Sequence, residues 1–157
     1  MLITRIDTDR FIFDVPAVLR DTVIDLARQL DEELESDNPG LHRLFPTAYA
    51  DDPERDAGYQ VLARGELIDG RRTSLTTVIE TAEADEFDGD TLDAWMRVVN
   101  DLRLVLGTNL NVSESVDWSP PPELESMYVV YQWLSILLGH IVEAQLPDEI
   151  DLDIDPD

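Results

Sequence analysis

The chain contains no lysine: all eleven of its basic residues are arginine, and they stand against 35 acidic residues. A P-loop lysine, a Schiff-base lysine and a lysine general base are therefore excluded. Cysteine is also absent, which excludes disulfides, thiolate nucleophiles, thiol redox switches and cysteine zinc sites within these residues. These two absences remove several large classes of enzyme and of metal site.

Positive charge is scarce, and the formal net charge is −24. Such a surface repels phosphate backbones and anionic lipid heads unless the few bases gather in one patch. We therefore expect neither a nucleic acid nor a membrane as partner, and a basic protein as the natural one. The first residues, MLITRIDTDR, carry charges before any apolar segment develops, so we expect no signal peptide and a cytoplasmic protein.

Long hydrophobic runs are few. The longest, over residues 127–142, is interrupted by Gln132, Ser135 and His140 and lacks basic flanks. A membrane-spanning helix needs ~20 predominantly apolar residues, so the run predicts a core helix instead. With 157 residues, of which 43% are hydrophobic, the chain suits one domain with one sizeable core.

The predicted fold is mainly α, a single-domain bundle of about five helices around a buried C-terminal helix. Apolar residues at helical spacing predict helices over residues 16–34, 53–83, 91–106 and 124–146, with a short turn over 41–45. Gly65 and Gly70 weaken the segment 53–83 locally, and we expect it to form one helix, either straight or kinked. We expect this domain to span residues 1–146, and the acidic tail over 147–157 to be mobile because it has little apolar surface.

Two β-prone runs, Ile3–Ile6 and Phe11–Val15, flank a turn and predict a β-hairpin within residues 2–15. Two strands alone are marginally stable, so the hairpin should lie on the helices or recruit a third strand, for which 110–112 is the candidate. The expected helix starts are Asp14 with Pro16, Asp52 with Pro53, and Asp90 or Thr91. The expected helix ends are Asn38-Pro39-Gly40 and Gly107.

Two acidic clusters and two histidines are the candidates for metal binding. The stretch DEFDGD and the alternate aspartates of 151–157 fail the EF-hand pattern, so solvated charge is the preferred interpretation. His140 and Glu143 share a helix face, but no second carboxylate–histidine pair matches them. We predict His140 to be a core or boundary residue and His42 a partly exposed loop residue. No metal, cofactor or catalytic residue is assigned, and no serine stands in a nucleophile-elbow pattern.

Arg64, Arg71 and Arg72 form the best basic patch in the sequence. On one continuous helix, their spacings of seven and eight place them near one face. They are candidates for docking an acidic partner or a phosphate. The alternative is internal pairing, because Glu66 and Asp69 are adjacent and acids outnumber bases about threefold.

Arg103 stands in the middle of the apolar helical run NDLRLVLGTNL, residues 100–110. Three roles are open: an outward side chain, a partly buried bridge to Asp101 or another acid, or a fork presented to a ligand. We expect Arg103 and Asp101 to act as a structural brace. Breaking a buried pair typically costs ~3 to 5 kcal/mol, whereas exposed pairs are worth ~0 to 1 kcal/mol.

Three segments carry a family resemblance: LHRLFPTAYADDPE over residues 41–54, VVNDLRLVLGTNLNV over 98–112, and YQWL over 131–134. Together they resemble the actinobacterial domain-of-unknown-function family 2017, across roughly residues 14–146. Members are often labelled transcriptional regulators, and their genes often lie beside that of the Clp protease adaptor, so the resemblance implies a cytosolic regulatory role. Where members use cysteines for redox sensing, this chain departs completely.

We expect a non-enzymatic regulatory protein that acts by protein contact through an acidic surface, in transcriptional or proteolytic regulation. A sigma factor, a DNA-binding regulator or a basic adaptor would suit as partner, with salt-sensitive association. One alternative is direct DNA binding, with the helix of Arg64, Arg71 and Arg72 as reader. Another is a small hydrolase or metal enzyme, which a deep pocket holding His140 and two acids would support. The oligomeric state is open, a homodimer included.

Overall fold

The computed structural model describes residues 2–34, 36, 41, 44, 51–113, 115 and 117–146, of which 60–62 by backbone only. Within these residues it contains four α-helices, a short 3-10 helix η2 (Pro122–Leu124) and a small antiparallel sheet. The mainly helical fold with an N-terminal hairpin is confirmed. The expected tail, the helix end at 38–40 and His42 lie outside the described residues.

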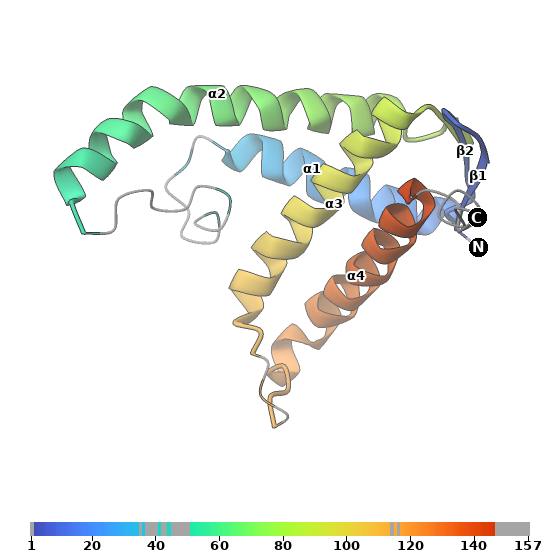
Figure 1. Ribbon diagram of the computed structural model, residues 1–157. Helices are drawn as coiled ribbons and strands as arrows, with labels where there is room; N and C mark the ends of the chain where they lie inside the picture. The colour runs from blue at the N-terminus through green and yellow to red at the C-terminus, as the bar shows by residue number, and fades with distance from the viewer. Residues whose placement is uncertain are drawn as a thin grey trace, which may run out of the picture.

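The helices form two antiparallel pairs. Helix α1 (Ala17–Glu33) lies along α2 (Pro53–Glu80), and α3 (Gly89–Leu110) lies beside α4 (Glu125–Gln145). In Figure 1 the second pair crosses the first, and the sheet lies at one end of the molecule. Helix α3 is the central element, because it contacts the other three helices and two strands. Its apolar side chains therefore form the middle of the core.

The sheet has the order β1–β2–β3. Strands β1 (Ile3–Asp7) and β2 (Arg10–Phe13) form the expected hairpin, in a register that places Ile3 opposite Phe13. The third strand is β3 (Glu86–Phe87), which pairs with β2. The expectation of a third strand at 110–112 was wrong, because residue 110 completes the last turn of α3 and is buried there.

An aromatic cluster joins the sheet to α3. Phe13, Phe87 and Trp95 are 3% exposed or less, and the ring centroids of Phe13 lie 4.4 Å from Phe87 and 4.7 Å from Trp95. Trp95 Nε1 donates a hydrogen bond of 2.9 Å to Thr81 Oγ1, which satisfies the one polar atom of the indole. The hairpin is thus held by packing on a helix, as two short strands require.

Helix α2 follows its sequence signals. Asp52 accepts a hydrogen bond from the Arg55 backbone N–H at 3.1 Å, and Pro53 is the first helical residue. The helix then runs through Gly65 and Gly70 to Glu80 without a break. The prediction of one helix with this start is confirmed, although it ends three residues earlier than expected.

Other boundaries differ from the prediction. Helix α1 begins after Pro16 without a side-chain cap, so Asp14 does not cap it. Helix α3 is capped by Asp88, whose carboxylate accepts from the Thr91 N–H at 2.8 Å, instead of by Asp90 or Thr91. It passes Gly107 and ends at Asn111, which has a left-handed φ of 54°. Asparagine tolerates that conformation better than other side chains do, and burial of the last turn favours the longer helix.

Helix α4 packs one face against α3 and β1. The buried residues on that face are Leu134, Leu137, Ile141 and Ala144. Its apolar character on nearly every side predicted fuller enclosure, yet Val129, Ile136 and Val142 are 62%, 56% and 41% exposed. By length and composition alone, Pro122–Gln145 is a helix that would suffice to cross a membrane, and 22% of its apolar stretch is buried.

Candidate functional site

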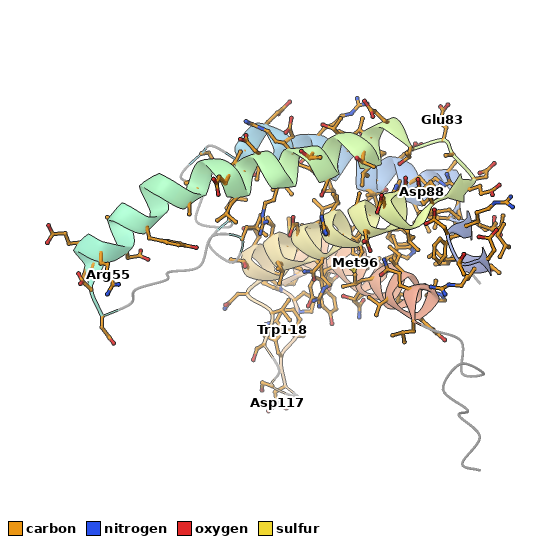
Figure 2. All side chains as sticks on the ribbon, turned by 45° about the horizontal axis from the view of Figure 1, so that its top comes forward. Arg55, Glu83, Asp88, Met96, Asp117 and Trp118 are labelled. Carbon is orange, nitrogen blue, oxygen red and sulfur yellow. The ribbon has the colours of Figure 1, made fainter. Side chains whose placement is uncertain are left out.

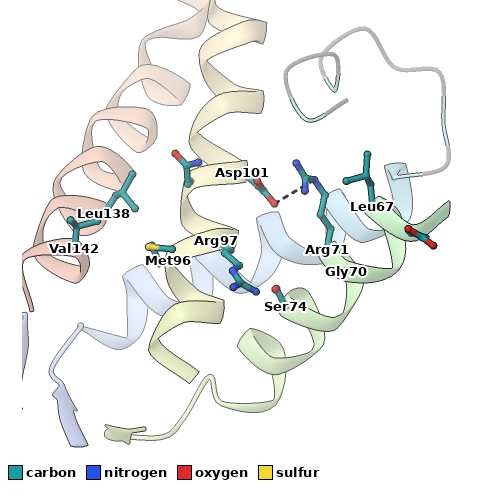
Figure 3. A pocket seen from close by; sticks show the side chains of 11 residues that line it. Leu67, Gly70, Arg71, Ser74, Met96, Arg97, Asp101, Leu138 and Val142 are labelled. Atoms are coloured by element: carbon teal, nitrogen blue, oxygen red, sulfur yellow. Dashed lines mark ion pairs between the residues drawn. The ribbon is translucent and has the colours of Figure 1, made fainter. Parts of the chain in front are cut away.

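A cleft of about 500 Å³ lies where α2, α3 and α4 meet. We call it the three-helix cleft, and Figure 3 shows it from close by. Its apolar or small lining residues are Leu67, Gly70, Met96, Leu138 and Val142. Its polar lining residues are Glu66, Arg71, Ser74, Arg97, Asn100 and Asp101. The volume falls within the range of about 300 to 1,000 Å³ that is common for small-molecule sites.

An ion pair spans the cleft between α2 and α3. The Nε of Arg71 lies 3.7 Å from Oδ2 of Asp101, and the Asp101 side chain is only 14% exposed. This separation is too long for a hydrogen bond. Burial raises the pKa of the Asp101 carboxyl to about 6, while the nearby Arg71 charge acts to lower it. The effect of desolvation on the pKa of Asp101 therefore outweighs that of the pairing with Arg71.

The two residues of the predicted brace take different partners. Arg103 Nη2 donates to Asn100 Oδ1 at 3.3 Å, and Arg103 Nε is buried without a hydrogen-bond partner in the described part of the chain. Asp101 pairs with Arg71 across the cleft. A structural role for Arg103 remains a prediction, and its hydrogen bond to Asn100 lies within its own helix.

The predicted basic patch also makes contacts within the chain. Arg64 Nη2 donates to the backbone carbonyl of residue 36 at 3.2 Å, and Arg71 Nη2 donates to that of residue 44 at 3.0 Å. Arg72 Nε lies 3.3 Å from Asp31 Oδ1 on α1. These contacts match the alternative of internal pairing. A docking role for the three arginines stays a prediction, and these contacts would have to be given up for phosphate binding.

No group of three or more histidine or acidic side chains suited to a metal ion occurs among the described residues. His140 is half-buried on α4, and its Nδ1 is buried without a hydrogen-bond partner there. Glu143 is exposed on the same helix. His140 and Glu143 are not among the residues that line the three-helix cleft, so that cleft does not provide the pocket of a histidine with two acids.

Arg20 is the buried charge that sequence reasoning missed. The residue is 7% exposed on α1, and its guanidinium stacks over the Phe13 ring at 4.8 Å from the centroid. It donates to four backbone carbonyls, those of Phe13, Val15, Ala82 and Ala84. One forked cation thus joins β2, α1 and the segment after α2. The spacing in the sequence could have predicted the burial of Arg20, because it precedes the buried residues Val23 and Ile24 by three and four positions on one helix face.

A depression of about 450 Å³ opens beside this buried arginine. Four carboxylates line it, those of Asp14, Asp21, Glu83 and Asp85, and all four residues are exposed. Asp85 Oδ1 lies 3.3 Å from Arg20 Nη2, while the other donors of that guanidinium face backbone carbonyls. We call this feature the acidic depression, and its lining presents negative charge to solvent.

The helical bundle with a small sheet defines the class of protein, and comparison with known sequences defines the family. A family model described as "Domain of unknown function (DUF2017)" matches residues 10–145. The chain belongs to this family.

The chain is also 30% identical over 126 residues to proteins named "Oxidative stress regulator AosR" in Mycobacterium bovis and Mycobacterium tuberculosis. In each comparison the match covers 67% of this chain and 57% of the relative. The chain therefore spans little more than half the length of these relatives. No solved structure matches it.

Proposed function

We propose that the chain is a non-enzymatic regulatory protein that binds a basic protein partner through the acidic depression, in transcriptional or proteolytic regulation. The observation that carries this proposal is the arrangement of carboxylates around a buried arginine that is engaged internally. The names of the mycobacterial relatives support the regulatory part. They say nothing of the mechanism.

Further acids lie at the sheet end of the molecule. Figure 2 labels Glu83, which lines the depression, and the further acid Asp88 at this end. Exposed Asp7 and Glu86 form ion pairs with Arg10, which neutralises part of the charge. Because the net charge is −24, the remaining field attracts a basic surface and raises its association rate at low ionic strength.

The lack of cysteine bears on how such a regulator responds to oxidants. The relatives are named for oxidative stress, and these 157 residues contain no thiol. A disulfide or sulfenic acid switch cannot form in this chain. We propose that any thiol-based oxidant signal reaches it through the partner.

The test is affinity capture from lysate at low salt, followed by mass spectrometry. The wild-type chain is compared with the triple variant Asp14→Asn, Asp21→Asn and Glu83→Gln, which leaves Asp85 in contact with Arg20. The expected result is a basic protein enriched by the wild type at low salt and lost at high salt, because screening weakens the field. The triple variant should lose it at low salt too.

A matched control removes three exposed acids elsewhere, as Asp69→Asn, Asp117→Asn and Glu123→Gln. This variant changes the net charge equally but leaves the acidic depression intact, so it should retain the partner. Retention of the same partner by both variants would argue against the depression. If the wild type enriches no protein above background at low salt, the proposal of protein contact loses its support.

A further inference from the structure

The three-helix cleft has one apolar wall that no contact within the described chain closes. Met96 on α3 lies between this wall and the polar residues, and Leu138 and Val142 supply the wall from α4. Val142 is 41% exposed. A ligand that covers these apolar side chains removes them from water, and this burial favours binding in a cleft of this volume.

The opposite side of the cleft is rich in hydrogen-bond donors. Arg97 extends from α3 toward α2, where buried Ser74 lies (Figure 3). Asn100 stands one turn further along α3, and its Oδ1 already accepts from Arg103, which leaves its N–H₂ group for the cleft. No ion pair of Arg97 is formed within the described part of the chain. A guanidinium with an amide beside it matches the two oxygens of a carboxylate.

The charges around the cleft limit the ligand to a single negative charge. Arg71 and Arg97 are balanced formally by Glu66 and Asp101. A polyanion such as a nucleotide would meet both carboxylates as well as a chain of net charge −24. A monocarboxylate brings one negative charge instead of several, so it meets less repulsion from the same two carboxylates.

We propose that the three-helix cleft binds a small molecule made of one carboxylate on a compact apolar body. The carboxylate lies on Arg97 and Asn100, and the apolar body lies against Met96, Leu138 and Val142. Because α2, α3 and α4 all contribute, an occupied cleft ties the three helices together. This site is separate from the acidic depression, so it adds a small-molecule effector to the proposed regulatory function.

The experiment uses 3-phenylpropanoate as probe and its amide as the uncharged match, with titration calorimetry and ligand-observed NMR on the isolated chain. For a probe of this size we expect a dissociation constant on the order of millimolar. The amide should bind at least tenfold more weakly than the carboxylate. Arg97→Gln should lower the affinity for the carboxylate by a similar factor. Arg97 is exposed, so this variant is expected to fold.

A pair of glycine variants locates the probe. Gly70 lines the cleft, Gly65 does not, and an added Cβ meets nothing within 4 Å at either position of α2. Gly70→Leu should abolish probe binding by filling the cleft, whereas Gly65→Leu gains the same helix propensity and should bind as wild type. Circular dichroism checks that both variants are folded.

Several results would overturn the proposal: no binding to the wild type at about tenfold above the expected dissociation constant, equal binding of acid and amide, or unchanged binding in Arg97→Gln or Gly70→Leu. The test needs no protein partner. Its failure is therefore distinguishable from failure of the lysate capture.

Discussion

Replacing Arg20 with methionine should destabilise the protein strongly. Methionine keeps much of the length of the side chain but removes every donor, which leaves the carbonyls of Phe13, Val15, Ala82 and Ala84 without this partner. A hydrogen bond to a charged group is worth about 1.5 to 3 kcal/mol, so four would sum to roughly 6 to 12 kcal/mol if water stayed out. The acidic depression opens beside the site and lets water replace part of them. We expect a loss of about 3 to 5 kcal/mol in the free energy of unfolding.

The assay is urea unfolding followed by circular dichroism and by intrinsic tryptophan fluorescence, to which Trp95 contributes from its place against Phe13. Arg28→Met is the matched control, because Arg28 lies on the exposed side of the same helix; its change should stay within about 0.5 kcal/mol. Arg20→Lys should lose less unfolding free energy than Arg20→Met but still be less stable than wild type, because one ammonium group cannot reach all four carbonyls. A loss below about 1 kcal/mol in Arg20→Met would refute the reasoning.

The other predictions concern single side chains. The pKa of Asp101 in the folded protein is raised to about 6, so the folded state holds this proton more tightly than the unfolded state does. The stability that results is present at low pH and is lost as the pH rises through that value. Relative to Asp101→Asn, wild type should therefore lose about 3 kcal/mol of unfolding free energy in urea unfolding between acidic and neutral pH. A constant difference would contradict the shift, and Asp69→Asn controls for the loss of one charge. Arg103→Ala should cost ~3 to 5 kcal/mol if Arg103 is a brace, and a loss under about 1 kcal/mol in thermal unfolding would reject that role. Asn111→Ala should cost about 1 kcal/mol, because alanine adopts the left-handed conformation poorly; Asn109→Ala, at an exposed position within α3, is its control.

Helix α3 illustrates what the sequence determines. Its buried positions follow from spacing alone, since Leu92, Trp95, Val99 and Leu102 recur at three and four residues. The ends were harder to place. Asp88, Asp90 and Thr91 are all good caps in isolation, and pairing of residues 86–87 with β2 fixes the chain so that Asp88 takes the position. The pairing of β3 with β2 thus decides which residue caps α3, and a local sequence pattern does not show this pairing.

The candidate sites depend even more on tertiary structure. Arg71 and Asp101 stand thirty residues apart on different helices, so their pairing follows from how α2 packs on α3. The three-helix cleft also requires α4, and hydrophobic periodicity does not predict which faces of the three helices pack around it. For Arg20, the position on the apolar face of α1 was visible in the spacing, but its partners Ala82 and Ala84 follow only from the tertiary structure.

The turn of the hairpin and the start of α3 are joined by one hydrogen bond. The Gly89 N–H donates to Asp9 Oδ1 at 2.8 Å, across 80 residues of chain. On a translating ribosome that adds 5 to 20 residues per second, the segment that anchors the hairpin follows it by roughly 4 to 16 s. During that interval the two strands lack β3, α3 and α4, on which they pack, and isolated two-stranded hairpins are barely stable. The uncovered strand edges are therefore open to pairing with other chains until β3 and α3 have emerged.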